Sequence, residues 1–150
     1  GGAVLAGCGF ELRRTPPMSF SRLALVGFPA RSPMERELRL ALASQVQLVA
    51  SPAQAEVVFR ALVDERQRVV VASTAASQVR ELQLRLRLAF RVERGDGREL
   101  APAAELMQVR DLSYNETQAL AKEHEEAQVL RDMQSDIVAQ VLRRLAAVKL

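Results

Sequence analysis

The clearest pattern of hydrophobic and polar positions lies between residues 81 and 92, where the sequence reads ELQLRLRLAFRV. Apolar residues occupy every second position, and the positions between them hold Gln, Arg and Ala. Successive side chains of a strand point to opposite faces of a sheet, so this period predicts a strand with one buried face. The residues expected on that face are Leu82, Leu84, Leu86, Leu88, Phe90 and Val92.

Residues 32–45 have the period of a helix instead. Ser32 is placed to cap the helix, and Pro33 suits its first position because a proline there gives up no hydrogen bond. The apolar stripe of this helix would consist of Met34, Leu38, Ala41 and Leu42.

Residues 115–150 predict one long helix, with Asn115 as its cap and Glu116 in its first turn. Apolar residues recur there every three or four positions, which indicates an apolar helix face that packs against a sheet. These residues are Leu120, Ala127, Leu130, Met133 or Gln134, Ile137, Val141, Leu145 and Val148.

The remaining segments indicate further strands. Residues 22–28 read as a short buried strand, and residues 105–113 follow a hairpin turn at Gly-Asp-Gly 95–97. Residues 55–73 are rich in β-branched residues but are interrupted by a polar run, so they form either one long bulged strand or two short ones.

The order of elements is therefore strand, helix, three strands, helix. This order predicts an α+β fold: a two-layer sandwich with both helices packed on one face of a mixed four-stranded sheet. We expect residues 21–150 to form this single domain.

The amino-acid composition argues against some classes of function. The chain has 150 residues, of which 49% are hydrophobic and 4% aromatic, and its net charge is +3. It has no Trp and one Tyr, so it offers few stacking side chains and we expect no nucleic-acid partner. No apolar stretch approaches the length that crosses a bilayer.

The residues that usually carry catalysis are scarce. His124 is the only histidine, and it lies among Lys122, Glu123, Glu125 and Glu126 in the predicted long helix, where a solvated position is expected. The chain has no nucleophile elbow, P-loop, dinucleotide fingerprint or metal-ligand spacing. We therefore expect neither enzymatic activity nor a bound metal.

The only cysteine, Cys8, follows Leu5, Ala6 and Gly7. This order matches the lipobox of bacterial lipoproteins, in which the thiol is joined to diacylglycerol, the peptide is cut before the cysteine and the new amine is acylated. The attached acyl chains hold a protein domain at a bilayer, because each buried CH₂ group contributes about 0.8 kcal/mol to the free energy of membrane binding. We interpret Cys8 as the lipid attachment site rather than an inert thiol, and expect no cofactor besides its covalent diacylglycerol and N-acyl chain.

The lipobox also divides the N-terminal region. The uncharged residues 1–7 are interpreted as the remnant of a lipoprotein signal peptide. Residues 8–20 would be the acylated cysteine and an extended tether, because Pro16 and Pro17 disfavour a helix there.

Two parts of the chain resemble the LptE family of lipopolysaccharide-assembly lipoproteins, formerly called rare lipoprotein B. The first is Cys8-Gly-Phe-Glu-Leu-Arg13, which resembles the mature N-terminus of that family. The second is Asp111-Leu-Ser-Tyr-Asn-Glu-Thr117, with Leu120-Ala-Lys-Glu123 and Arg131-Asp-Met133 after it, which is similar to the family's strand-to-helix segment. The family's fold, two helices on a four-stranded sheet, agrees with the element order above.

The resemblance implies a non-catalytic, lipid-anchored protein of the outer membrane that faces the periplasm. It would plug the LptD β-barrel, help that barrel to assemble and bind lipopolysaccharide on its way to the outer leaflet. The alternative is a periplasmic lipoprotein that scaffolds another envelope complex without binding lipopolysaccharide.

The resemblance also implies candidate ligand-binding residues. Lys122 matches the lysine of the family's Leu-Ala-Lys motif, which is implicated in contact with lipopolysaccharide. A second basic position does not carry over, because Ala75 stands near its place, and Arg80 is the nearest basic substitute. The competing interpretation of Lys122 is an ion pair with Glu126, four residues later on a solvated helix face.

Overall fold

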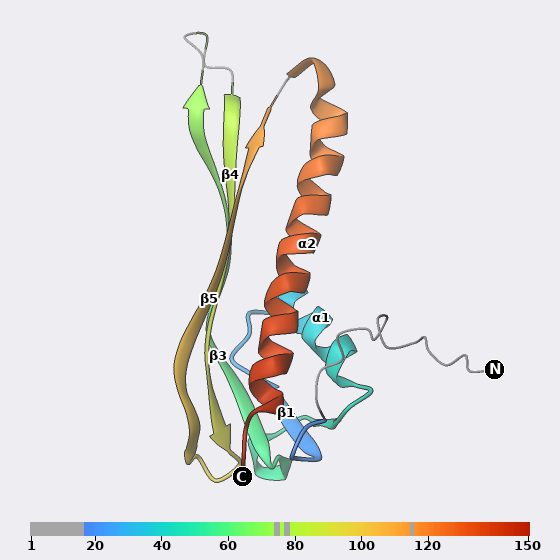
Figure 1. Cartoon of the computed structure of the whole chain (residues 1–150), viewed down its shortest axis with the longest axis vertical. Coiled ribbons are helices and arrows are strands. Elements are labelled where there is room, and N and C mark those ends of the chain that lie inside the picture. The colour runs from blue at the N-terminus through green and yellow to red at the C-terminus, as the bar shows by residue number, and fades with distance from the viewer. Residues whose placement is uncertain (1–16, 74–75, 77–78, 115) are drawn as a thin grey trace, which may run out of the picture.

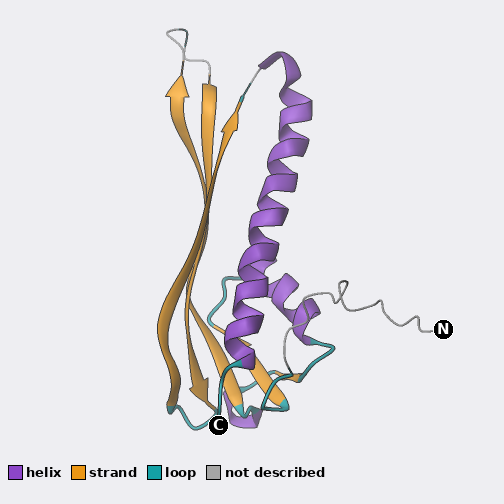
Figure 2. Cartoon of the chain, viewed as in Figure 1, coloured by secondary structure: helices purple, strands orange, loops and turns teal. Residues whose placement is uncertain are grey.

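Two helices lie against one face of a mixed sheet (Figure 1; Figure 2), which confirms the predicted α+β fold class. The computed structural model describes residues 17–73, 76, 79–114 and 116–150. The strands are β1 (Arg22–Val26), β2 (Gln47–Val49), β3 (Val57–Ser73), β4 (Val79–Arg94) and β5 (Glu99–Ser113). The helices are α1 (Pro33–Leu42) and α2 (Ala119–Ala146), with short 3₁₀ helices η2 (Pro52–Gln54) and η3 (Glu116–Gln118).

The sheet has five strands in the order β2-β1-β3-β4-β5, so the prediction of four strands is wrong. β1 pairs in parallel with β2 and β3, whereas β3, β4 and β5 form an antiparallel meander. The additional strand, β2, lies at one edge and has only three residues. Three residues are too few to show the two-residue period that identifies a strand in a sequence.

α1 begins as the sequence indicates but ends earlier. The Ser32 hydroxyl accepts a hydrogen bond from the Glu35 N–H at 3.0 Å, and Pro33 is the first helical residue. The helix ends at Leu42 rather than at residue 45. The N–H groups of Gln45 and Val46 both donate to the Leu42 carbonyl, so the chain turns there and continues into β2.

β3 is one strand of 17 residues, which decides between the alternatives for residues 55–73. Its register with β4 shifts between Ala61 and Val63 and again between Val70 and Ser73. Beside the first shift, Gly27 has a φ of +87°, and a Cβ atom there would lie 2.3 Å from the Ala61 carbonyl oxygen. The close approach of β1 and β3 therefore requires a glycine at residue 27.

β4 and β5 are both longer than their predicted ranges. All six residues expected on the inner face of β4 are buried, which confirms the faces of this strand. In the turn between the strands, Gly97 has a φ of +94°. β5 begins at Glu99 rather than at residue 105, and it includes Pro102, which an edge strand tolerates because its outer N–H groups need no partner.

α2 differs from the predicted long helix at its start. The expected cap, Asn115, lies outside the described residues, and Glu116 lies in η3 rather than in the first α-helical turn. Leu120 is 70% exposed, contrary to its place in the predicted stripe. Lys122, two residues later, contacts the sheet. Because residues two apart point to nearly opposite sides of a helix, Leu120 faces away from the sheet.

The main core fills the space between the helices and the sheet. Phe59 is fully buried in it, and its ring centroid lies 5.9 Å from that of Phe28 and 4.6 Å from that of Phe90. The opposite face of the sheet carries a smaller cluster of Ala24, Ala55 and Val58. Among the described residues, no helix is both long enough and apolar enough to span a membrane.

The two ends of the folded region are joined at the same place. The Ser19 hydroxyl donates a hydrogen bond of 2.5 Å to the carbonyl of Val148, which is two residues beyond the end of α2. Phe20 and Val148 are both buried in the main core. The segment that enters β1 and the segment that leaves α2 therefore pack together.

Candidate functional site

The two basic residues expected to contact a ligand lie at the same end of the domain. Lys122 is in the first turn of α2, and Arg80 is the second residue of β4. Glu81, which follows Arg80, pairs with Ser113 of β5, and the Ser113 hydroxyl lies 3.4 Å from the Lys122 Nζ. The Arg80 side chain lies outside the described part of the structure, so the proximity is that of the Arg80 backbone.

Lys122 already has an anionic neighbour. Its Nζ lies 2.9 Å from Glu125 Oε2, and the side chains of Lys122 and Glu125 are 18% and 47% exposed. Glu126, the partner in the competing interpretation of Lys122, pairs with Arg68 of β3 instead. Exposed pairs contribute only about 0.2 to 1 kcal/mol, so a phosphate can compete with Glu125 for the ammonium. The N-terminal end of a helix also favours an anion.

Two other positions singled out in the sequence cannot be placed. Cys8, the predicted lipid attachment site, and Ala75, near the second basic position, both lie outside the described residues. Lipid attachment at Cys8 therefore stays a prediction from the sequence.

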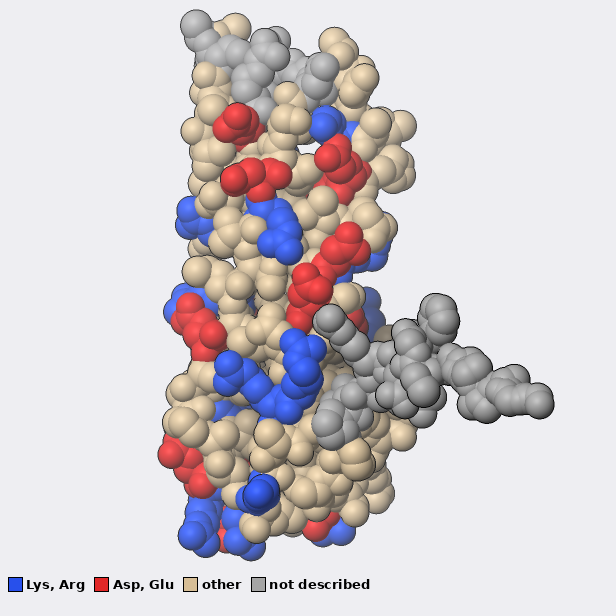
Figure 3. Space-filling view, in the orientation of Figure 1, with Lys and Arg blue, Asp and Glu red and all other residues tan. Residues whose placement is uncertain are grey.

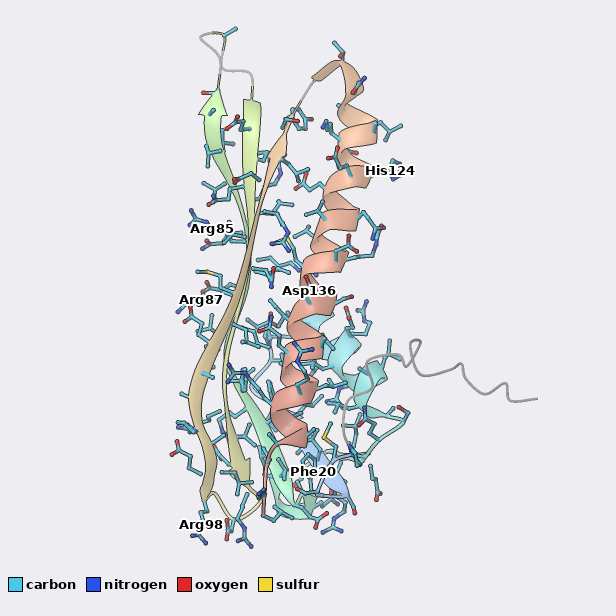
Figure 4. The ribbon with its side chains drawn as sticks, in the orientation of Figure 1. Phe20, Arg85, Arg87, Arg98, His124 and Asp136 are labelled. Atoms are coloured by element: carbon cyan, nitrogen blue, oxygen red, sulfur yellow. The ribbon has the colours of Figure 1, made fainter. Side chains whose placement is uncertain are left out.

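His124, Glu123 and Glu125 lie on the outer surface of α2, whereas Glu126 faces the sheet. Figure 4 shows His124 pointing away from the sheet, and Glu123 and Glu125 are exposed. Over the part of the chain that the structure describes, no group of three His, Cys, Asp or Glu side chains could hold a metal ion.

Polar contacts join α2 to β3. Arg68 Nε lies 2.8 Å from Glu126 Oε1, and Arg66 donates a hydrogen bond of 2.6 Å to Gln134 Oε1. The Gln134 amide in turn donates to Glu37 of α1 at 2.8 Å. Gln134 therefore links α2 to both the sheet and α1.

Similar contacts join the other side of α2 to β5. Lys122 and Ser113 meet near the start of the helix, and Arg110 Nη2 lies 3.7 Å from Asp136 Oδ2 farther along it. Figure 4 shows Asp136 on α2, and Figure 3 shows acidic and basic side chains interspersed over this side of the molecule. Charges of both signs thus line the helix where it meets the sheet.

The outer face of the sheet is also of mixed charge. Arg85 and Arg87 point away from α2 (Figure 4). Arg87 lies 3.1 Å from Glu105 and 3.6 Å from Glu65, whereas Arg85 Nε donates to Gln83 at 2.6 Å. A shallow hollow of about 220 Å³ lies among these side chains. Carboxylates accompany Arg87 in this hollow, as Glu125 accompanies Lys122.

The sequence did not indicate the partners of Lys122 and Glu126. One signal was present, because Asp64, Arg66 and Arg68 alternate with the period of a strand and therefore share a face. That face is turned to the helices, as the contact of Arg68 with Glu126 shows. A polar run inside a β-rich segment was interpreted as an interruption, whereas it supplies the side chains that meet α2.

Comparison with known proteins gives a family match. The model of the LptE family, described as "Lipopolysaccharide-assembly", matches residues 20–145. No curated protein matches the chain.

Solved structures share the fold. Lipoprotein B from Nitrosomonas europaea, itself uncharacterized, is 28% identical with a TM-score of 0.76, over 93% of this chain and 91% of that one. A minor lipoprotein from Acinetobacter baumannii is 24% identical with a TM-score of 0.68, over 87% and 94% of the two chains. Rare lipoprotein B from Shewanella oneidensis is 23% identical with a TM-score of 0.67, over 85% and 95%.

Proposed function

The chain belongs to the LptE lipopolysaccharide-assembly family, and on this premise we propose that it plugs the LptD β-barrel of the outer membrane, helps that barrel to assemble and binds lipopolysaccharide during its delivery to the outer leaflet. The role is non-catalytic. Acyl chains on Cys8 would hold the protein at the membrane, with the folded domain facing the periplasm.

The family match over residues 20–145 carries this proposal. It runs from the buried Phe20 to the last turn of α2, and so covers all or nearly all of every described strand and helix. The match therefore concerns the whole folded domain and not a single motif.

The arrangement of Lys122 and Arg80 supports the ligand-binding part of the proposal. Lipopolysaccharide presents phosphates beside acyl chains, and a basic side chain at the end of a sheet can pair with a phosphate. Lys122 lies at the N-terminal end of α2, and the backbone of Arg80 lies near it. The two cations would act on one ligand only if they reach the same phosphate group or neighbouring ones.

Copurification tests the proposal. The full-length lipoprotein would be extracted from cells in mild detergent and captured by a C-terminal tag, and the captured proteins and lipopolysaccharide would be identified by mass spectrometry. We expect a large β-barrel and lipopolysaccharide in the same fraction. Capture of a different envelope complex with no lipopolysaccharide would replace the proposal with the scaffold alternative.

A matched variant separates the two parts of the function. Lys122→Glu with Arg80→Glu should still capture the barrel but less lipopolysaccharide. Loss of the barrel together with the ligand, in a variant that melts at the wild-type temperature, would show that this end of the domain serves barrel contact.

A further inference from the structure

The two halves of α2 are packed very differently. All of this helix is described, and none of residues 119–132 is buried. The second half contributes seven buried residues, and they begin at Met133. The seven are Met133, Gln134, Ile137, Val138, Val141, Leu142 and Leu145. The second half is therefore part of the core, whereas the first half lies on its margin.

Polar contacts to two strands hold the first half in place. Glu126 pairs with Arg68 of β3, whose side chain is 49% exposed, and Lys122 meets Ser113 of β5. Exposed contacts of this kind stabilise weakly, because water screens the charges and competes for the hydrogen bonds. Local opening with few buried apolar contacts to break requires less free energy than global unfolding.

Buried apolar side chains of the sheet lie beneath the first half of α2, and we call them the apolar floor. Leu82 and Leu84 of β4 are each 1% exposed, and Leu112 of β5 is 8% exposed. On the helix, Val129 and Leu130 are partly buried and pack against the same core. Lys122 and Glu126 precede them on the side of the helix that meets the sheet, so charged side chains border apolar strand residues here.

We infer that the first half of α2 is a movable cover, and that its displacement opens a binding site for the acyl chain of a phosphate-bearing amphiphile. The chain would lie on the floor of Leu82, Leu84 and Leu112, which is what burial of apolar surface favours. Phosphate groups would replace Glu126 at Arg68 and Glu125 at Lys122. The site rests on the proposed function and deepens it, because it identifies where the lipid part of the ligand binds.

The hinge lies at the boundary between the two halves. Gln134 is bound to Arg66 of β3 and to Glu37 of α1, and Ser135 donates a further hydrogen bond of 3.0 Å to Glu37. These contacts and the buried Met133 fix the helix from this point onward. Only the turns before them are free to move away from the sheet.

Crosslinking the cover to the sheet tests the inference. In the Cys8→Ala protein, Arg68→Cys and Glu126→Cys would be joined by a bifunctional maleimide with a reducible spacer that spans the original pair. The same variant with both thiols capped by a monofunctional maleimide is the matched control. A second crosslink, between Glu37→Cys and Ser135→Cys, ties α1 to α2 beyond the hinge and controls for general rigidity.

The readout is the affinity for purified, fluorescently labelled lipopolysaccharide. If opening is required, the Arg68–Glu126 crosslink should weaken binding by about tenfold or more, because the competent state is depopulated. Cleaving the spacer should restore the affinity, and the second crosslink should leave it unchanged. Binding by the crosslinked protein within about twofold of the capped control would overturn the inference.

If the capped control protein no longer binds lipopolysaccharide, a simpler variant tests whether the cover must open. Glu126→Gln weakens the pair that closes the cover but keeps Arg68, so it should bind lipopolysaccharide several-fold more tightly. Equal or weaker binding, with an unchanged melting temperature, would count against the cover. Failure of the uncrosslinked Cys8→Ala protein to bind at all would instead refute the proposed function.

Discussion

The Glu93 carboxylate lies 2.9 Å from the Arg60 Nε, on the face of the sheet that points away from the helices. A second guanidinium, that of Arg91, is 2.7 Å from the same oxygen. The hydrogen bond from Arg60 lowers the pKa of Glu93 below its ordinary value of 4.5, although burial acts in the opposite direction, and Arg91 lowers it further.

This pairing should make part of the stability depend on pH. A carboxyl group whose pKa is lower in the folded protein stabilises fully above its unfolded pKa and loses that contribution as the pH falls through the folded value. Glu93→Gln should therefore reduce the free energy of unfolding at pH 7 by about 1 to 2 kcal/mol, between the values for exposed pairs and charge-assisted hydrogen bonds. Urea unfolding of both proteins from pH 7 downward measures the difference, which should shrink below pH 4.5. Glu99→Gln, at an exposed carboxylate, is the control, and a difference that does not change with pH would contradict the assignment.

Leu86 and Arg85 are neighbours on opposite faces of β4. Leu86 is 1% exposed, so Leu86→Asp buries an unpaired carboxylate and should cost several kcal/mol of a typical stability of about 5 to 15 kcal/mol. Arg85→Asp, on the outer face, should cost about 1 kcal/mol or less. Thermal melts followed by circular dichroism compare the two. Equal losses of stability would mean that the outer face also packs against something in solution.

Charge reversal at one end of the domain should weaken ligand binding. Lys122→Glu with Arg80→Glu removes two cations from the end where α2 begins, so the affinity for lipopolysaccharide should fall by at least about tenfold if each lost contact contributes 1 kcal/mol or more. Added salt should weaken the wild type in the same direction. Titration of labelled lipopolysaccharide in two salt concentrations measures both effects.

The control for that experiment reverses the same number of charges elsewhere. Arg98 lies at the far end of the molecule from α2's first turn, as Figure 4 shows for Arg98 and His124, and Lys149 follows the core residue Val148. Arg98→Glu with Lys149→Glu should leave the affinity nearly unchanged. Equal weakening by the two double variants would mean that binding follows net charge and not a site.

Removing the thiol should change the location of the protein and not its fold. Cys8→Ala deletes the predicted acylation site, whereas the first strand begins at Arg22 and the core at Phe20. The variant should melt at the wild-type temperature and appear in the periplasmic fraction. Cells without the barrel partner are needed, because barrel contact alone could retain the variant. Recovery in outer-membrane fractions from those cells would refute lipid anchoring through Cys8.

The sequence predicted the elements whose signals are local. The alternation from Leu82 to Val92 and the Ser32 cap of α1 both require only neighbouring residues, and both are confirmed. β2 was missed because it is a strand only through its pairing with β1. The start of β5 was missed because Pro102 argues against a strand unless the strand is known to lie at an edge.

The candidate site was predictable only in part. Lys122 was identified by resemblance, and the competing interpretation, an ion pair with Glu126, named the wrong acidic residue. Two acidic residues lie within helical reach of Lys122, and contact with another element decides between them. That element is β3, whose Arg68 is 58 positions from Glu126 in the chain. The helix sequence alone suggests an ion pair between Glu126 and Lys122, whereas in the folded protein Glu126 pairs with a strand of the sheet.

The hydrogen bond between Ser19 and Val148 has a mechanical consequence. If Cys8 is fixed in a bilayer, any tension along the tether reaches the domain at the point where the entering segment is fastened to the segment after α2. The load then passes into Phe20, β1 and the buried second half of α2. The weakly packed turns of α2, at the other end, bear none of it, so they can move while the domain is held under strain.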